Sequence, residues 1–298
     1  IPYRQDKGEE GGRGILPRGL MKVIMAPALG FCKGVDNAVR KAEIAVEERR
    51  GKENIYFFGN IVHNNKVVDS LLSKGGKVVF SPDEVDGPGC LIVRAHGITD
   101  SLRSGFEAKG LEIIDCTCPV VLRGQSLVRE SEKPVLILGY KGHSEVDSLF
   151  GSAPYNAIVI SEPEDLDGVE KGSYRAVVQT TFSISRMEKI LEKAREKGIE
   201  IDKANSICLA SVSRRNGVRR IADEVEAFVV VGSSHSANTR ELVETASRLG
   251  KPSFLAEDCE SIPDEVFSYG IIGLTAGAST PYEEYIKVKE RLESYDNG

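Results

Sequence analysis

Short apolar runs alternate along this chain with segments in which apolar residues recur at helical spacing. Ten runs have the composition of strands: KVIMAP (22–27), NIYFFG (54–59), CLIVRAHG (90–97), LEIIDC (111–116), PVLILGY (134–140), AIVIS (157–161), RAVVQTT (175–181), AFVVVGS (227–233), SFLAE (253–257) and GIIGLTAG (270–277). Helical patterns follow most of them, for example over residues 35–50 and 240–250. This alternation predicts parallel sheets covered by helices, with sites at the carboxyl ends of the strands.

Polar residues at these strand ends repeat three times along the chain. Three strands end in a glycine that is followed, four positions later, by a polar residue and then a helix; the pairs are Gly59 and His63, Gly139 and His143, and Gly232 and Ser236. Adding the cysteine that precedes each pair and the polar group of the next matching strand gives three sets: Cys32, His63 and His96; Cys118, His143 and Thr180; Cys208, Ser236 and Ser279. The repeat predicts three similar α/β units that converge on one central pocket.

The repeat also predicts where one unit ends and the next begins. We expect α/β domains over residues 21–118, 119–205 and 206–293, a tail over 294–298 and a disordered extension over 1–20, which is rich in Gly and charge. Because one chain supplies all three units, a monomer would suffice to build the pocket.

Composition excludes two classes of function. The chain has 298 residues, 41% hydrophobic and 28% charged, with a formal net charge of -6, so it lacks the basic surface expected of a nucleic-acid-binding protein. No apolar stretch approaches the roughly 18 residues of a membrane helix. Six cysteines without a secretory signal are typical of a reducing compartment, and we expect a cytoplasmic protein with free or metal-binding thiols.

The three repeated cysteines are candidate metal ligands. A free cysteine is usually a small buried residue, and a lone histidine is usually structural, but their recurrence at one topological position favours a site. Their long separations do not suit a structural zinc site, whereas soft thiolates from three domains suit an iron-sulfur cluster. Three ligands would leave one iron open to substrate. The other cysteines, Cys90, Cys116 and Cys259, are interpreted as non-ligands, although Cys116 lies only two positions from Cys118.

The remaining polar groups define the expected ligand. Donors at strand ends and helix starts, without Lys or Arg, predict a phosphate or diphosphate site; they are His63, His96, His143, Thr180, Thr181, Ser236, Asn238 and Ser279. Glu145 is the one carboxylate attached to the repeat. Burial beside an anion would raise its pKa and suit a general acid. Alternatively, Glu145 is an ordinary first-turn residue that the helix dipole favours.

Several motifs together resemble those of a known family. They are GFCKGV, NIVHNNKVVDSL, RAHG, DCTCP, GHSEV, QTT and TAGAS, and the likeness runs from about Met21 to about Leu292. They are similar to the signatures of the LytB/IspH family of 4-hydroxy-3-methylbut-2-enyl diphosphate reductases. This resemblance implies a pseudo-threefold trefoil of three α/β domains around a 4Fe-4S cluster held by Cys32, Cys118 and Cys208.

The resemblance also implies a reaction and its residues. The family reductively dehydroxylates 4-hydroxy-3-methylbut-2-enyl diphosphate, at the open iron, to isopentenyl and dimethylallyl diphosphates, the last step of the methylerythritol phosphate pathway. Ferredoxin or flavodoxin would supply electrons one at a time. Glu145 and Thr180 would deliver a proton to the leaving hydroxyl, with His143 near the substrate. The diphosphate would be bound by His63, His96, Ser236, Asn238 and Ser279.

The sequence departs from the family in the loop at residues 233–239. Ala237 stands where the family usually has a second serine, and His235 stands where it usually has asparagine. The lost hydroxyl would weaken diphosphate binding by roughly 1 kcal/mol if nothing replaces it. Cys116 stands where the family commonly has alanine.

Two other functions compete with the reductase. A dehydratase of the quinolinate-synthase type would use three thiolates and a cluster as a Lewis acid alone, and would consume no electrons. An iron-sulfur sensor would need neither Glu145 nor a diphosphate site, and it would need an output motif that this chain does not show. GHSEV and TAGAS favour the reductase.

Overall fold

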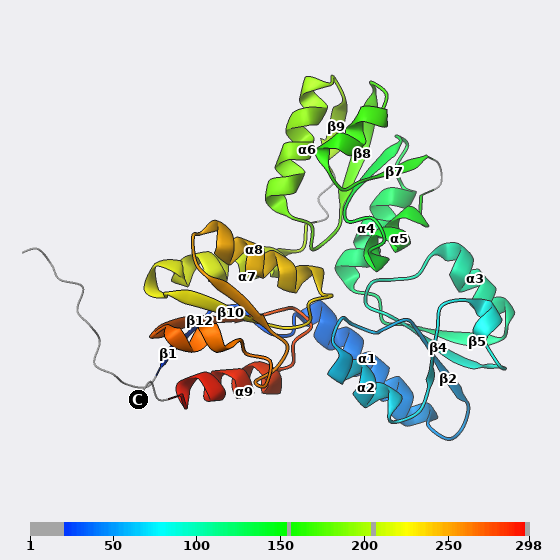
Figure 1. Cartoon of the computed structure of the whole chain (residues 1–298). Helices are drawn as coiled ribbons and strands as arrows, with labels where there is room; N and C mark the ends of the chain where they lie inside the picture. Colours follow the sequence, from blue (N-terminus) through cyan, green and yellow to red (C-terminus); the bar gives the residue numbers. More distant parts are fainter. Residues whose placement is uncertain (1–20, 154–155, 204–206, 296–298) are drawn as a thin grey trace, which may run out of the picture.

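A computed structural model describes residues 21–153, 156–203 and 207–295. The predicted extension over residues 1–20 and residues 296–298 of the predicted tail lie outside this part. Three α/β units surround a common centre, as Figure 1 shows. Each unit contains one parallel sheet of four strands, so the expected trefoil of α/β domains is confirmed.

The first unit has the strand order β3-β2-β4-β5, and every neighbouring pair is parallel. Its elements are α1 (Lys33–Arg49), β2 (Asn54–Phe58), α2 (Asn65–Leu72), β3 (Lys77–Val79), η1 (Pro82–Glu84), β4 (Gly89–Val93), α3 (Asp100–Ala108) and β5 (Leu111–Asp115).

The second unit repeats this arrangement with the order β7-β6-β8-β9, again parallel throughout. Its elements are α4 (Pro119–Arg129), β6 (Val135–Leu138), α5 (Ser144–Phe150), β7 (Ala157–Ile160), η2 (Pro163–Gly168), β8 (Ser173–Val178), α6 (Ile184–Glu196) and β9 (Glu200–Lys203).

The third unit is closed by the start of the chain. Its elements are α7 (Leu209–Ile221), η3 (Ala222–Glu224), β10 (Ala227–Val231), α8 (Ala237–Arg248), β11 (Ser253–Ala256), η4 (Asp264–Ser268), β12 (Ile271–Ala276) and α9 (Tyr282–Glu293). Its sheet has the order β1-β12-β10-β11, in which β1 (Lys22–Met25) pairs in parallel with β12. The predicted division is therefore wrong for this strand, which belongs to the third unit rather than the first.

Burial explains which strands could be recognised in the sequence. The two central strands of each sheet are almost wholly buried where they reach the core, as in AFVVV of β10 and VLIL of β6. Continuous apolar runs are typical of parallel strands covered on both faces. Two short edge strands, β3 (KVV) and β9 (EIDK), are more exposed and were not predicted.

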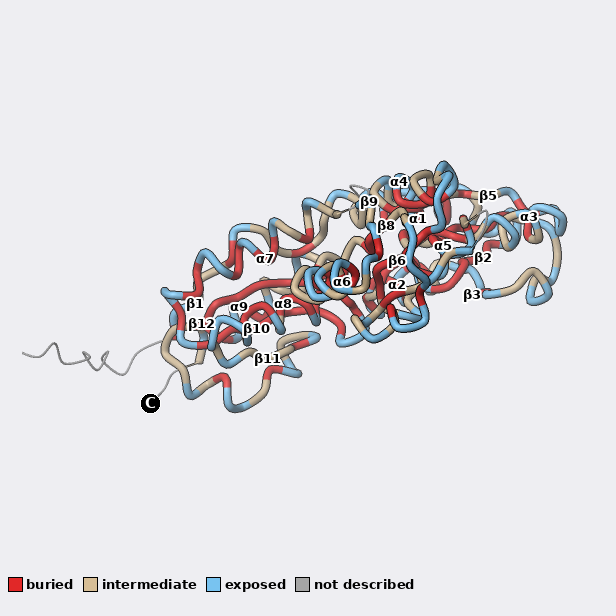
Figure 2. Tube along the Cα trace, turned by 90° about the horizontal axis from the view of Figure 1, so that it is seen from above, coloured by how far each residue is buried: buried red, intermediate tan, exposed pale blue. Residues whose placement is uncertain are grey.

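The view at right angles, Figure 2, shows a flat molecule with buried strands inside the units and more exposed helices around them. Helices α4 and α7 run along the same edge of this view. Among the described residues, no helix has both the length and the apolar character needed to cross a membrane.

Candidate active site

One cavity of about 90 Å³ lies where the three units meet, and all twelve residues that the sequence singled out line it. They are Cys32, His63, His96, Cys118, His143, Glu145, Thr180, Thr181, Cys208, Ser236, Asn238 and Ser279. No single unit contains the cavity, because each of the three units contributes some of the lining residues. The threefold repeat thus corresponds to a real convergence of side chains.

The three cysteines occupy equivalent junctions. Each follows the edge strand of one sheet, namely β1, β5 or β9, and is the N-cap of the helix that begins the next unit, namely α1, α4 or α7. The amide of Val35 donates to Sγ of Cys32 at 3.4 Å. Three helix N-termini therefore meet at the thiols, and their partial positive charge favours an anionic group bound there.

The three thiols fit a shared iron-sulfur centre. A Cβ atom placed on Gly34 would lie 2.5 Å from Sγ of Cys118 and 3.9 Å from Sγ of Cys32, so both sulfur atoms lie beside this glycine. Burial raises the pKa of Cys118, and the nearby amides of Val120 and Val121 oppose that effect. Soft ligands from three units are the donor set that a cluster requires.

A buried arginine completes the surroundings of the thiols. Arg214 is 4% exposed and donates a hydrogen bond to the carbonyl of Gly30. Its Nε atom has no partner among the described residues, although Cys32 and Cys208 lie close enough to oppose the lowering of its pKa by burial. A guanidinium here would offset the charge of an anionic cluster, which supports the fit. Sequence reasoning missed Arg214 because it lies inside an ordinary helical pattern.

The other three cysteines lie away from the cavity. Cys116 packs in the core of the first unit, and burial raises its pKa to about 12. Cys90 is buried in β4 of the same core, and burial raises its pKa to about 11. Cys259 lines a separate cleft described below. The closely spaced pair Cys116 and Cys118 is therefore split, with only the second thiol in the cavity.

Three histidines form one wall of the cavity. The ring centroids lie 4.4 Å apart for His63 and His96, 5.7 Å for His63 and His143, and 5.6 Å for His96 and His143. Burial lowers the pKa of His63 to about 4 and that of His143 to about 3, and it also lowers the pKa of His96. All three rings are consequently neutral at pH 7.

Hydrogen bonds from the backbone and neighbouring side chains fix this wall. Nδ1 of His143 accepts from the amide of Glu145 at 3.1 Å, so the neutral ring carries its proton on Nε2 and can donate. Ser279 Oγ donates to the carbonyl of His63 at 3.0 Å, and Ser148 Oγ donates to that of His96 at 2.8 Å. These contacts join the units across the cavity.

Several donors in the wall are buried and unused. Nε2 of His63, Nδ1 of His96 and Nδ2 of Asn238 have no hydrogen-bond partner among the described residues. Asn238 is oriented because its Oδ1 accepts from the amide of Ala278 at 2.9 Å. Buried polar groups are normally paired. Unpaired groups from both the histidine wall and the third unit therefore indicate a place for a bound ligand rich in acceptors, such as a diphosphate.

Glu145 and Thr180 form a hydrogen-bonded pair in the cavity wall. The carboxylate accepts from the Thr180 amide at 2.7 Å and from Thr180 Oγ1 at 2.7 Å. Glu145 is 2% exposed, and burial raises its pKa to about 7 despite these hydrogen bonds. A carboxyl group that holds its proton at neutral pH can act as a general acid.

The structure adds basic groups that the sequence reasoning did not include. A wider opening of about 500 Å³ adjoins His63 and His143 and is also lined by Arg94, Arg240 and His235. The positive charges of the two arginines contribute to the low pKa values of both histidines. The prediction of a site without Lys or Arg holds for the cavity lining but not for its mouth. A signal was present, since Arg94 lies two residues before His96.

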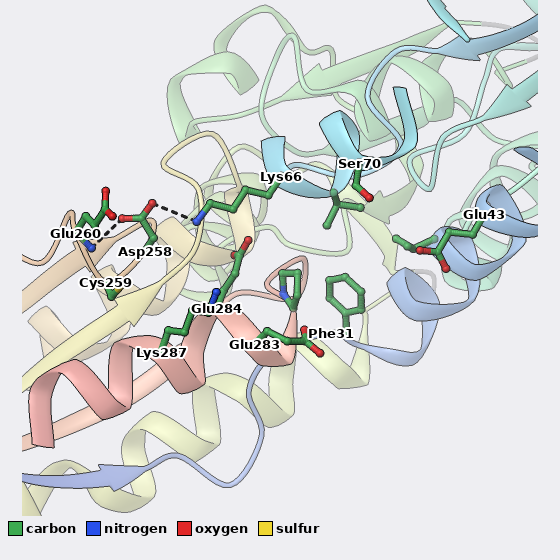
Figure 3. Close-up of a pocket in the computed structure, with 13 residues that line it drawn as sticks. Phe31, Glu43, Lys66, Ser70, Asp258, Cys259, Glu260, Glu283, Glu284 and Lys287 are labelled. Atoms are coloured by element: carbon green, nitrogen blue, oxygen red, sulfur yellow. Dashed lines mark hydrogen bonds and ion pairs between the residues drawn. The ribbon is translucent and has the colours of Figure 1, made fainter. Parts of the chain in front are cut away.

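A second hollow, larger than the central cavity, lies elsewhere. Figure 3 shows this cleft of about 720 Å³ between the first and third units, lined by Phe31, Lys66, Asp258 and Glu284 among others. Lys66 and Asp258 form an ion pair across it at 3.2 Å. Asn64, the N-cap of α2, donates to Glu284 at 3.1 Å. The cleft wall thus supports the loop that carries His63.

Comparison with known proteins identifies the family of this chain. The family model described as LytB protein matches residues 23–293. A protein of Treponema denticola named 4-hydroxy-3-methylbut-2-enyl diphosphate reductase is 35% identical over 286 residues, covering 91% of this chain and 99% of that protein. A protein of the same name from Ralstonia nicotianae is 34% identical over 282 residues, covering 92% and 86% of the two chains.

Solved structures give the same result. The E-1-hydroxy-2-methyl-but-2-enyl-4-diphosphate reductase of Plasmodium falciparum matches with a TM-score of 0.85 at 29% identity, covering 91% of this chain and 87% of that one. Another structure, of (E)-4-hydroxy-3-methyl-but-2-enyl diphosphate reductase, matches with a TM-score of 0.67 at 29% identity, covering 93% and 100%. The family model spans nearly the whole chain, including every residue of the cavity. The chain therefore belongs to the LytB family.

Proposed function

We propose that this protein is a 4-hydroxy-3-methylbut-2-enyl diphosphate reductase that yields isopentenyl and dimethylallyl diphosphates, the last step of the methylerythritol phosphate pathway. The reaction breaks the allylic C–O bond, takes up two electrons and two protons, and releases water. The observation that carries the proposal is the meeting, in one cavity, of three thiols, three neutral histidines and a buried Glu145. The names of the relatives support the same activity.

The cofactor follows from the family and the thiols. Membership of the LytB family supports an iron-sulfur enzyme. Three cysteines without a fourth in the cavity lining support a 4Fe-4S cluster with Cys32, Cys118 and Cys208 as its ligands. Such a cluster, when bound, would supply electrons and an open, Lewis-acidic iron for the substrate's hydroxyl group. Free thiols at all six cysteines suit a reducing cytoplasm.

The diphosphate would occupy the wall of unpaired donors. His63 Nε2, His96 Nδ1 and Asn238 Nδ2 are buried without partners, and a diphosphate oxygen would satisfy each. His143 can donate through Nε2, because its Nδ1 is already used. Ser236 Oγ accepts from the amide of Thr239 at 3.3 Å, which leaves its proton free to donate. Ser279 and Thr181 add hydroxyl groups to the same lining.

Because the three histidines are neutral donors, their protonation would change when an anionic ligand binds beside them. As the diphosphate enters, its negative charge would raise the histidine pKa values and draw protons onto the rings. Arg94 and Arg240 at the mouth would attract the anion before it reaches the histidines. Affinity would therefore combine long-range attraction at the mouth with hydrogen bonds inside.

Proton delivery would fall to Glu145 and Thr180. Burial raises the pKa of the carboxyl group to about 7, so a large share of it carries a proton near neutral pH. Thr180 lies within hydrogen-bond distance of both carboxyl oxygens through its amide and its hydroxyl. Thr180 can therefore orient the carboxyl group of Glu145 and relay the proton of Glu145 to the departing hydroxyl group. General acid catalysis of this kind contributes about 10² to 10⁴ in rate.

The test uses anaerobically purified protein. Iron and sulfide content and an absorbance spectrum are measured first, and then the oxidation of a reduced viologen dye on addition of the allylic diphosphate. We expect about four irons per chain and dye oxidation that depends on the substrate. A cluster without dye oxidation would contradict a reductase and favour a dehydratase, while protein that binds no iron would contradict the assignment of the cysteines.

A further inference from the structure

The helices that begin at the three cysteines expose residues immediately beside the cavity. The residues that follow the cysteines are Lys33, Pro119 and Leu209, and all three are exposed. Leu209 is 80% exposed, and Leu122, in the first turn of α4, is 40% exposed. Helices α4 and α7 lie along one edge of the molecule in Figure 2. The exposed residues at the starts of α1, α4 and α7 are called the helix-start face; they are Lys33, Pro119, Leu122, Arg123 and Leu209.

The charge of the helix-start face is opposite to that of the whole protein. The chain carries a formal charge of -6, yet α4 and α7 contain no Asp or Glu. Exposed cations accompany the two leucines, with Lys33 at the start of α1 and Arg123 in α4. Exposed apolar side chains accompanied by cations, without acidic residues in the same helix starts of α4 and α7, suit recognition of a protein of negative charge.

Two other surfaces approach the same thiols and fit a protein partner less well. The cleft of Figure 3 contains Phe31, the neighbour of Cys32, but Glu43, Glu260 and Glu283 line it and would repel an acidic protein. The mouth with Arg94 and Arg240 is basic, but it opens onto the histidines. A protein bound there would block the path of the substrate.

We propose that the helix-start face is the docking surface for a small acidic protein that carries single electrons, with an iron-sulfur or flavin group. The proposal rests on the proposed reductase function, because that reaction consumes two electrons for each C–O bond broken. A one-electron carrier must therefore dock twice per turnover, each time becoming oxidised by one electron. Docking beside Leu209 and Leu122 places the carrier one residue from Cys208 and four from Cys118 along the chain.

The test compares two electron sources in the cluster-containing enzyme. Leu209→Glu and Arg123→Glu alter the helix-start face, while Tyr282→Glu and Lys287→Glu make the same types of change at exposed positions of α9. Each variant is assayed with a reduced ferredoxin of net negative charge and, separately, with a reduced viologen dye. We expect kcat/KM for ferredoxin to fall by about tenfold or more in the face variants only, with a weaker dependence on salt. The viologen-driven rate should stay within about twofold of the unmodified protein in all four variants.

Two results would overturn the docking surface: ferredoxin-driven rates in the face variants equal to those of the unmodified protein, or impairment of the α9 variants instead. Failure of the reductase function is distinguishable, since the unmodified protein would then fail to oxidise the dye. In that case docking is measured by calorimetric titration with oxidised ferredoxin. Binding lost only in Leu209→Glu and Arg123→Glu would support the surface, and equal binding by all four variants would refute it.

Discussion

Replacing Glu145 by Gln tests the central chemical claim, because it removes an acidic proton while keeping the shape of the side chain. Burial raises the pKa of Glu145 from 4.5 to about 7. This change increases the protonated fraction at pH 7 by about 150-fold, an effect worth about 3 kcal/mol. The amide of glutamine can still accept from the Thr180 amide, which now lies 2.7 Å from Oε1. We therefore expect an intact cluster spectrum and a kcat lowered by about 10² to 10⁴.

The pH dependence of the rate gives a second readout of the same prediction. A pKa raised by burial means that the acid form is present below about pH 7 and is lost as the pH rises through that value. The kcat of the unmodified protein should fall on the alkaline side, whereas the residual rate of Glu145→Gln should be level there. Viologen oxidation at saturating diphosphate measures both.

A matched control is available for this substitution. Glu241 is also 2% exposed, and burial raises its pKa, but it lies outside the cavity and forms ion pairs with Arg215 and Arg248. Glu241→Gln should affect stability rather than turnover. A rate for Glu145→Gln within about threefold of the unmodified protein would refute the role of Glu145 as the acid.

Three further predictions concern the ligands and the diphosphate loop. Cys118→Ser should lose the cluster, whereas Cys116→Ser should keep it, because the Cys116 thiol packs in a hydrophobic core; absorbance spectra decide, and a colourless Cys116 variant would reverse the assignment. Gly34→Ala should lower iron content, since its Cβ would lie 2.5 Å from Sγ of Cys118, while Gly168→Ala, with no atom within 4 Å, should not. Ala237→Ser should restore a hydroxyl group to the cavity lining and lower the KM for the diphosphate by about fivefold, equivalent to about 1 kcal/mol; an unchanged KM would contradict a contact there.

The site could be predicted from the sequence because its residues lie at equivalent positions of a repeated unit. In parallel sheets the carboxyl ends of neighbouring strands meet at one edge, so polar residues there converge even when they are far apart in the chain. His96 and Thr180 follow β4 and β8, which occupy the same place in their sheets. The convergence of Cys32 with Cys208 could be proposed on the same ground.

Groups without such a position escaped prediction. Arg214 lies in the middle of α7 and differs from the exposed Arg219 only in the direction of its side chain. Arg94 follows β4 directly and lies over the ring of Phe58, at 4.8 Å from the ring centroid, which holds the guanidinium near the histidines. A linear pattern of residue types records neither orientation. The position of Arg94 near His96 was a signal in the sequence, but only the packing around both arginines shows where their side chains lie.

The place of β1 shows how the convergence of the three cysteines can be predicted from an incomplete topology. From the sequence, the strand before Cys32 is expected to begin the first unit, whereas the structure shows that the strands before Cys118 and Cys208, β5 and β9, each end a unit. In the structure, β5 and β9 are edge strands of the sheets that they end, so the equivalent edge of the third sheet has to be filled from outside. The start of the chain fills it, and Lys22 pairs with Ile271. Every thiol thus lies at a junction between two units, and this is why all three reach the centre.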